Sequence, residues 1–137
     1  MMLEKSCGAI VYKKIDSNFE FLAIKSNSPD GHWGFPKGHA EEEETEEETC
    51  KREVFEETGL IITLHNGFKV CDKYQLSENT YKEVVLFIAC AENQSVVLKE
   101  DEIAEYKWDS FKEIYNLLTY DSTKNMLVKA SSFLDTI

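Results

Sequence analysis

Residues 38–60 read GHAEEEETEEETCKREVFEETGL, and this segment encodes both the start and the end of a helix. Thr45 stands three positions before Glu48, a capping-box arrangement in which a hydroxyl and a carboxylate satisfy free backbone amides at a helix start. Gly59 can adopt the left-handed conformation that ends helices. The segment therefore predicts a helix that begins directly after Thr45 and ends directly before Gly59.

Three glutamates lie on one face of this predicted helix. Glu53, Glu56 and Glu57 are three and four residues apart, so at roughly 100° per residue their carboxylates share one arc. Crowded carboxylates repel one another unless they share a cation. Hard oxygen ligands suit Mg²⁺, with Mn²⁺ as a substitute, and such a cation can polarise a phosphoryl oxygen. The three residues are therefore candidate metal ligands, whereas Cys50 and Val54 on the neighbouring arc can face a core.

Arg52 is the only arginine in the chain. Its planar guanidinium can hold a carboxylate through two parallel hydrogen bonds, which the lysine ammonium cannot do. Glu48, one turn before Arg52, is a candidate exposed partner, and Glu44 or Glu53 are candidate buried partners. Arg52 is therefore expected to organise the acidic side chains around it.

Glutamate occupies seven of the eight positions from 41 to 48. An acidic run of this kind is usually a solvated surface. We apply that interpretation to five of these residues: Glu41, Glu42, Glu43, Glu46 and Glu47. An alternative is that the run binds a basic partner protein.

Composition indicates one small cytoplasmic domain. The chain has 137 residues and a net charge of −11, which argues against nucleic-acid binding through a basic surface. No apolar stretch is long enough to span a membrane, and the first residues lack a signal-peptide core. The four cysteines, Cys7, Cys50, Cys71 and Cys90, are far apart, so we expect reduced core residues. We also expect the protein to act as a monomer.

Strands and helices are predicted in mixed order, which indicates an α/β fold. A turn at 16–18 joins two strands, and a turn at 28–31 leads into a glycine-rich loop at 33–39 before the acidic helix. Asp109 or Ser110 can cap a later helix. The predicted strands are 6–13, 19–24, 60–66, 68–74, 82–91 and 105–108, and the predicted later helices are 111–118 and 122–133.

The order of glycine, glutamate and arginine in residues 38–60 resembles a complete Nudix box, Gly-x5-Glu-x7-Arg-Glu-U-x-Glu-Glu-x-Gly-U, where U is aliphatic. Nudix hydrolases cleave a nucleoside diphosphate linked to another group. The strings at 19–22, 32–39, 67–69 and 106–108 are similar to the asymmetric diadenosine tetraphosphate hydrolases. The resemblance implies an α/β/α sandwich around a mixed β-sheet over residues 1–137. It also implies hydrolysis of diadenosine tetraphosphate (Ap4A) and related dinucleoside polyphosphates, with Ap4A giving ATP and AMP.

The resemblance also implies a set of catalytic residues. Glu53, Glu56 and Glu57 would hold Mg²⁺ together with the backbone carbonyl of Lys37. Two further residues, Glu44 and Arg52, would orient these ligands. Outside the box, the family position that joins the metals or acts as the base matches Glu102. The other interpretation of Glu102 is a surface acid that precedes a strand.

Substrate contacts can be assigned in the same way. The positions that contact the polyphosphate in the family match His32, Lys37, His39 and Lys82. The pair of rings that encloses an adenine matches Tyr74 and Tyr120, and Tyr81 is an alternative to Tyr74 because the loop at 75–80 does not align cleanly. A structural role for His32 and for each tyrosine stays open. Trp33, Phe35 and Trp108 are assigned to packing.

Two other nucleotide-related functions stay open. A housecleaning nucleoside triphosphate hydrolase or an RNA 5′-pyrophosphohydrolase would share the box and differ in the recognition residues. An inactive Nudix domain could bind nucleotides without cleaving them, but such domains usually lose box glutamates and this chain has all of them. The chain departs from the family in two respects: no Pro-Gly turn precedes Glu44, and the substrate loop lacks extra basic residues.

Overall fold

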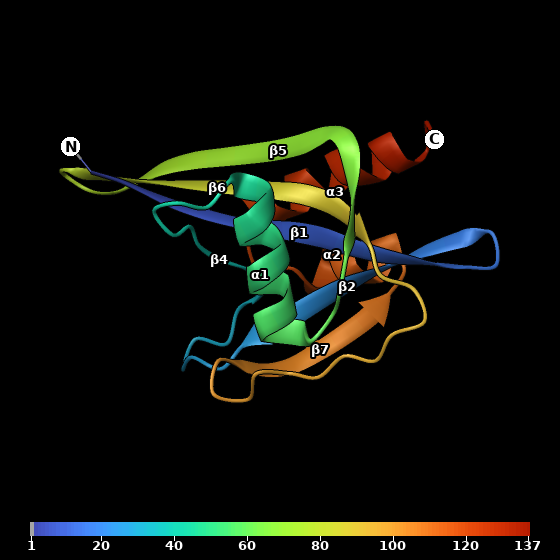
Figure 1. Cartoon of the computed structure of the whole chain (residues 1–137). Helices are drawn as coiled ribbons and strands as arrows, with labels where there is room; N and C mark the ends of the chain where they lie inside the picture. The colour runs from blue at the N-terminus through green and yellow to red at the C-terminus, as the bar shows by residue number, and fades with distance from the viewer. Residues whose placement is uncertain (1) are drawn as a thin grey trace.

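The computed structural model describes residues 2–137, which form a seven-stranded mixed sheet with helices on both faces (Figure 1). No helix in this range is long and apolar enough to cross a membrane. The elements are β1 (Met2–Ile15), β2 (Asn18–Ser26), β3 (Trp33–Gly34), β4 (Lys37–His39), α1 (Glu46–Thr58), β5 (Thr63–Ser77), β6 (Thr80–Cys90), β7 (Ile103–Asp109), α2 (Phe111–Leu117) and α3 (Asp121–Leu134).

Strand β1 lies at the centre of the topology. The main path of the sheet runs β3-β2-β1-β6-β5, with β4 paired to β1 and β7 paired to β2. The pairing of β1 with β6 is parallel, and the other pairings are antiparallel. The sheet is therefore mixed, as the resemblance implied.

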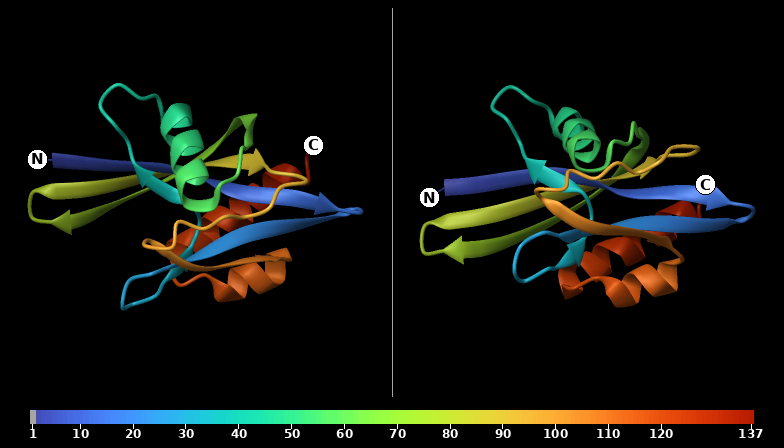
Figure 2. Two further views of the ribbon diagram at one scale, coloured as in Figure 1. Left: turned by 60° about the horizontal axis from the view of Figure 1, so that its bottom comes forward. Right: turned by 90° about the horizontal axis from the view of Figure 1, so that it is seen from below.

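Two apolar cores lie on opposite faces of the sheet. Even-numbered residues of β1 and β6, such as Ile10 and Leu86, pack with α2 and α3, whereas odd-numbered residues such as Ala9 and Val85 pack with α1. Figure 2 shows α1 on one side of the sheet and α2 beside α3 on the other. This alternation follows from the two-residue period of a strand, and it confirms the predicted α/β/α sandwich.

The predicted bounds of α1 are confirmed. The Thr45 hydroxyl accepts a hydrogen bond from the Glu48 amide at 3.1 Å, and the Glu48 carboxylate accepts one from the Thr45 amide at 2.8 Å. At the other end Gly59 has φ 72°. Cys50 and Val54 are fully buried against the sheet, as their position on the helix predicted.

The interpretation of Glu46 as a solvated surface acid is wrong. Its carboxylate forms an ion pair with Lys5 of β1 and accepts a hydrogen bond from Lys69 of β5 at 2.7 Å. The two strands each bring a lysine beside the first turn of α1, and a linear sequence does not reveal that meeting. The ion pairs lower the pKa of Glu46.

Several other predictions need correction. The two strands predicted at 60–66 and 68–74 are one strand, β5, whose register shifts between Leu64 and Lys69 around Gly67 at φ 85°. The loop predicted at 33–39 contains the short strands β3 and β4, because their backbones pair with β2 and β1. All four cysteines are free, as expected, but Cys71 is exposed on the edge strand β5.

The capping box generates a stability prediction. Thr45→Ala should lower the free energy of unfolding by about 1 kcal/mol, because the Glu48 amide loses its hydrogen-bond acceptor. Urea unfolding followed by circular dichroism measures the change. Thr45→Ser retains the hydroxyl and should keep most of the stability; equal losses in the two variants would contradict the role of the hydroxyl.

Candidate active site

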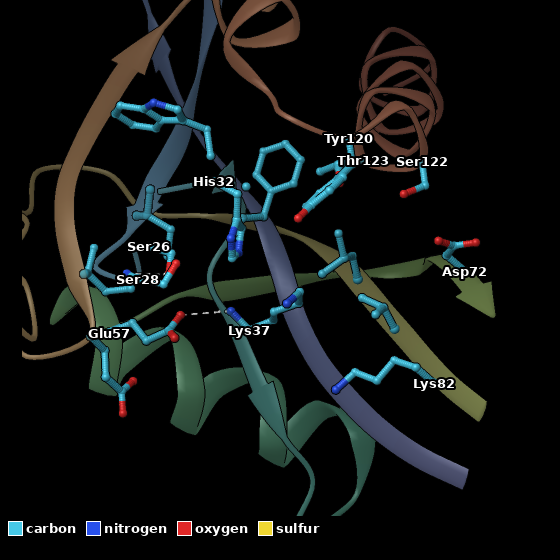
Figure 3. Close-up of a pocket in the computed structure, with 18 of the residues that line it drawn as sticks. Ser26, Ser28, His32, Lys37, Glu57, Asp72, Lys82, Tyr120, Ser122 and Thr123 are labelled. Carbon is cyan, nitrogen blue, oxygen red and sulfur yellow. Dashed lines mark hydrogen bonds between the residues drawn. The ribbon is translucent and has the colours of Figure 1, made fainter. Parts of the chain in front are cut away.

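A cavity of about 1100 Å³ opens on the α2 and α3 side of the sheet and reaches the C-terminal end of α1 (Figure 3). Strands β1, β2, β5 and β6, the β2–β4 segment and the start of α3 all contribute to its wall. Of the residues predicted for the site, eight line this cavity: His32, Lys37, His39, Glu57, Tyr74, Lys82, Glu102 and Tyr120.

Glu57 is the acidic side chain of α1 that faces the cavity. It is 8% exposed, and its Oε1 accepts a hydrogen bond from the Lys37 amide at 3.0 Å. Figure 3 shows this bond between the end of α1 and β4. Burial raises the pKa of Glu57 to about 8, because desolvation penalises the charged carboxylate. A nearby cation would relieve that penalty.

Arg52 connects α1 to the chain before it. Its Nε and Nη2 donate to the two carboxylate oxygens of Glu44 at 2.6 and 2.8 Å, and Nη2 also donates to the His39 carbonyl at 3.0 Å. Its Nη1 lies 3.2 Å from Glu53 and 3.3 Å from Glu56. The predicted partners Glu44 and Glu53 are confirmed.

The proposed pairing of Arg52 with Glu48 is wrong, because the Glu48 carboxylate is occupied by the capping box. Glu44, by contrast, accepts hydrogen bonds from Arg52, from the Glu41 amide and from the Thr49 hydroxyl. The pKa of Glu44 is lowered to about 2, and the hydrogen bonds from Arg52 are the main cause. Glu44 therefore remains ionised and holds Arg52 in place.

Gly38 allows the carboxylate of Glu53 to approach the backbone of β4. A Cβ atom at this position would overlap that carboxylate and would force it to move. Burial and the neighbouring Glu56 raise the pKa of Glu53. The absence of a side chain at the box glycine thus lets the Glu53 carboxylate lie against β4.

The donor set at the end of α1 fits a hard divalent cation. Glu53, Glu56 and Glu57 offer carboxylate oxygens within one helical turn, and the raised pKa values of Glu53 and Glu57 show that their negative charge is poorly compensated. As the side chains stand in residues 2–137, no three acidic, histidine or cysteine groups are gathered closely enough to bind a metal without rearrangement. Glu53 and Glu56 turn toward Arg52 instead, so their role as ligands stays a prediction.

Glu102 lies beside Asp101 on the wall of the same cavity. The Asn27 amide donates to the Glu102 carbonyl at 2.8 Å, and Lys99 pairs with the Glu102 carboxylate at 3.1 Å. Glu102 contributes to the raised pKa of Glu57, although burial is the main cause. The structure thus brings this acid, from a distant part of the sequence, near the end of α1.

Lys82 is a buried cation in the wall of the cavity. It is 9% exposed, and its Nζ donates to the Ser6 hydroxyl at 2.6 Å. Within residues 2–137 it forms no ion pair with a carboxylate. Burial and, to a lesser extent, Lys37 lower the pKa of Lys82. An anionic ligand would supply the missing countercharge.

His32 lies between the basic and aromatic parts of the cavity. Its ring centroid is 5.7 Å from that of Tyr120 (Figure 3). Burial, followed by Lys37, lowers the pKa of His32, so its neutral form is favoured. The loop that carries His32 is joined to the loop before α3 by two hydrogen bonds, from the Trp33 amide to the Thr119 hydroxyl at 2.8 Å and from the Thr119 amide to the Trp33 carbonyl at 3.2 Å.

Of the two tyrosines considered for the first ring position, only Tyr74 lines the cavity. Tyr81 precedes Lys82 on β6 and points to the opposite face of the sheet, where it is paired in register with Leu3. We therefore remove Tyr81 from the candidate site. Trp33 and Phe35 pack against the core as predicted, and Trp108 packs against the core on the α1 side.

Residues absent from the sequence-based prediction also contribute to the cavity. Asp72 and Glu4 line it on β5 and β1, and Ser6 orients Lys82. Ser6 could have been noticed as a polar residue at the start of an otherwise apolar run, but its partner is 76 residues away. No local signal identifies Asp72 or Glu4.

Comparison with known proteins agrees with this geometry. A NUDIX domain profile matches residues 4–129. The asymmetric bis(5′-nucleosyl)-tetraphosphatase of Caenorhabditis elegans is 28% identical over 97% of this chain and 98% of its own length, and that of Mus musculus is 29% identical over 97% of both chains. The crystal structure of a C. elegans Ap4A hydrolase binary complex superposes with a TM-score of 0.89 at 27% identity, covering 98% of this chain and 99% of that one.

The contact between Gly38 and Glu53 generates a metal-binding prediction. Gly38→Ala should weaken Mn²⁺ binding about tenfold or more, because the added methyl group displaces a carboxylate at the end of the acidic helix. Isothermal titration calorimetry measures the dissociation constant. Gly34→Ala is the control, since a Cβ atom there meets no atom within 4 Å; equal Mn²⁺ affinity in both variants would contradict the prediction.

Proposed function

The chain belongs to the Nudix family of hydrolases, and we propose that it uses Mg²⁺ to hydrolyse diadenosine tetraphosphate and related dinucleoside polyphosphates. The observation that carries this proposal is the composition of one continuous cavity. Glu57 and Glu102 lie in its wall with the cations Lys37 and Lys82 and the rings of Tyr74 and Tyr120. The acids can bind a metal ion, the lysines can bind a polyphosphate, and the aromatic rings can stack on a nucleobase.

The likeness to the tetraphosphatases supports the same substrate class. It extends over 97% of the chain and 98% of the C. elegans enzyme, so it includes the cavity as well as the box. The box alone would fit other Nudix hydrolases. The two tyrosines provide the second argument, because a ring on either side of a base favours substrates that present a nucleoside beyond the phosphates.

Residues of the chain would position the substrate for attack. Lys37 and Lys82 would bind phosphate oxygens, with His32 and His39 as further hydrogen-bond partners. Tyr74 and Tyr120 would enclose one adenine. Because four of these six side chains lie on three strands of a packed sheet, the phosphates would be held against a rigid wall.

Nudix hydrolases use divalent metal ions, and here Glu53, Glu56, Glu57 and the Lys37 carbonyl would hold Mg²⁺, which would offset phosphate charge and lower the pKa of a water. Glu44 and Arg52 would orient these carboxylates. Glu102 would take the proton as the water oxygen forms a bond to phosphorus. The bond from that phosphorus to the bridging oxygen breaks, and the electron pair leaves with the departing phosphate chain.

Chromatography of the products tests the proposed reaction. Wild-type protein with Mg²⁺ should convert Ap4A to equal amounts of ATP and AMP, and a chelator should stop the reaction. In ¹⁸O-water the label should appear in AMP if the attack is on the phosphorus that becomes AMP. Label in ATP would contradict that point of attack. Faster hydrolysis of a nucleoside triphosphate or of a 5′-triphosphate RNA would contradict Ap4A as the preferred substrate.

Two glutamates of α1 provide a matched pair of variants. Glu56→Gln should lower kcat by several orders of magnitude, because it removes one predicted metal ligand and its transition-state charge stabilisation. Glu47→Gln removes the same charge from an exposed position in the first turn of α1 and should leave kcat unchanged. Near-normal turnover by the Glu56 variant would place the metal elsewhere.

A further inference from the structure

Glu102 belongs to a turn, residues 99–102, that is attached to the same helix end as Glu57. This turn closes the connection between β6 and β7, residues 91–102, which forms no helix or strand and passes beside the C-terminal end of α1 (Figure 2). The Lys99 amide donates to the Glu57 carbonyl at 3.2 Å, and the Glu102 amide donates to the Lys99 carbonyl at 2.9 Å. A short chain of backbone hydrogen bonds therefore leads from Glu57 to Glu102.

Asn27 attaches the 99–102 turn to the sheet. It directly follows β2, and its backbone amide donates to the Glu102 carbonyl at 2.8 Å. Its side-chain Nδ2 donates to the Glu100 carbonyl at 3.0 Å. Asn27 and Glu102 both line the cavity. The side chain of Asn27 is thus bonded to the backbone that carries the acid.

The pairing of β2 with β7 is irregular directly before Asn27. Lys25 is paired with Glu105, but the next residue, Ser26, is paired with Ile103, so β7 has one extra residue at this point. A β-bulge of this kind bends a strand and disrupts the regular ladder of hydrogen bonds. The two bonds of Asn27 hold the chain beyond the bulge, so the position of the 99–102 turn depends on them.

Other contacts hold the earlier part of the same connection. The Gln94 side chain accepts a hydrogen bond from the Ile61 amide and donates one to the Ile61 carbonyl, both at 2.8 Å. The Val97 amide donates to the Thr58 carbonyl at 2.8 Å. These contacts are independent of Asn27. Loss of the Asn27 side chain should therefore loosen the turn that carries the acid and leave the rest of the connection in place.

We infer that Asn27 is a positioning residue, whose side-chain amide holds the 99–102 turn so that the Glu102 carboxylate stays beside the end of α1. This inference rests on the proposed function, in which Glu102 is the base, and deepens it by assigning the residue that places this base. Asn27 acts through Glu102 and takes no part in bond cleavage. A misplacement of about 1 Å in an active site can lower a rate about a hundredfold, so one hydrogen bond here affects kcat.

A double-mutant cycle tests the inference. Asn27→Ala removes the hydrogen bond to Glu100 and retains the backbone bond to Glu102. It should lower kcat for Ap4A about fivefold to tenfold and change KM by less than about twofold, because the lysines and tyrosines of the cavity lie on other elements. In a Glu102→Gln background the same substitution should change kcat by less than about twofold, because the group that Asn27 positions is already lost.

Two results of this cycle would overturn the inference. Equal losses of kcat from Asn27→Ala in the wild-type and Glu102→Gln backgrounds would show that Asn27 does not act through Glu102. Near-normal kcat in Glu102→Gln alone would show that this acid is not the base. Either result leaves hydrolysis of Ap4A by the wild type, and so the proposed reaction, intact.

Gln94→Ala is the matched control. It removes two hydrogen bonds from the same connection, at a residue that does not line the cavity. It should lower the midpoint of thermal unfolding and leave kcat within about twofold of the wild-type value. A loss of kcat equal to that of Asn27→Ala would show that kcat follows any loosening of the connection, and would overturn the inference.

Amide hydrogen exchange followed by NMR tests the attachment without turnover. Asn27→Ala should speed exchange of the Lys99 and Glu102 amides about fivefold, because their bonds open more often, whereas Gln94→Ala should speed exchange of the Ile61 amide instead. If the wild type does not cleave Ap4A, the proposed function fails, and this measurement still decides whether Asn27 holds the turn. Unchanged exchange of the Lys99 and Glu102 amides in Asn27→Ala would overturn the inference.

Discussion

The contact between β4 and α1 places the acidic helix against the sheet. Each of the three β4 residues meets one charged residue of α1: the Lys37 amide donates to Glu57, Gly38 lies under the Glu53 carboxylate, and the His39 carbonyl accepts from Arg52. Strand β4 is itself paired with β1 at the centre of the sheet. The positions of Glu53 and Glu57, and of the arginine that Glu44 and Glu56 share, therefore depend on a three-residue strand that is paired with β1.

This arrangement concentrates negative charge where the protein has little to neutralise it. Glu44, Glu53 and Glu56 share Arg52, and the Glu44 carboxylate makes the two shortest bonds to the guanidinium. Glu57 is buried with a single backbone donor. Since one arginine cannot neutralise four carboxylates, folding leaves a local excess of negative charge that a divalent cation can remove, which is the chemistry that Nudix hydrolases use.

Local signals in the sequence predicted local structure well. The capping box and Gly59 defined α1 because helix ends are determined by neighbouring residues. The adjacent strands β3 and β4 were missed, since a two- or three-residue strand exists only through its partner. Tyr74 and Tyr81 could not be distinguished without the β5–β6 register, because a shift of one residue reverses the face to which a side chain points. Glu46 was misassigned because its lysine partners come from two strands, β1 and β5, that are distant from it in the sequence.

The charge distribution of the cavity could not be predicted from the sequence for the same reason, because its charged residues come from distant parts of the chain. Glu4, Lys82 and Asp72 come from three strands and meet only through the parallel β1–β6 and antiparallel β5–β6 pairings. Because these side chains point to one face, the cavity wall is polar near the start of β6. Two and four residues farther along, at Val84 and Leu86, the same face is apolar and belongs to the core that includes α3. A two-residue period thus serves two purposes on one sheet face. Toward the middle of β6 it builds the core, and toward the start of β6 it lines the cavity with polar side chains.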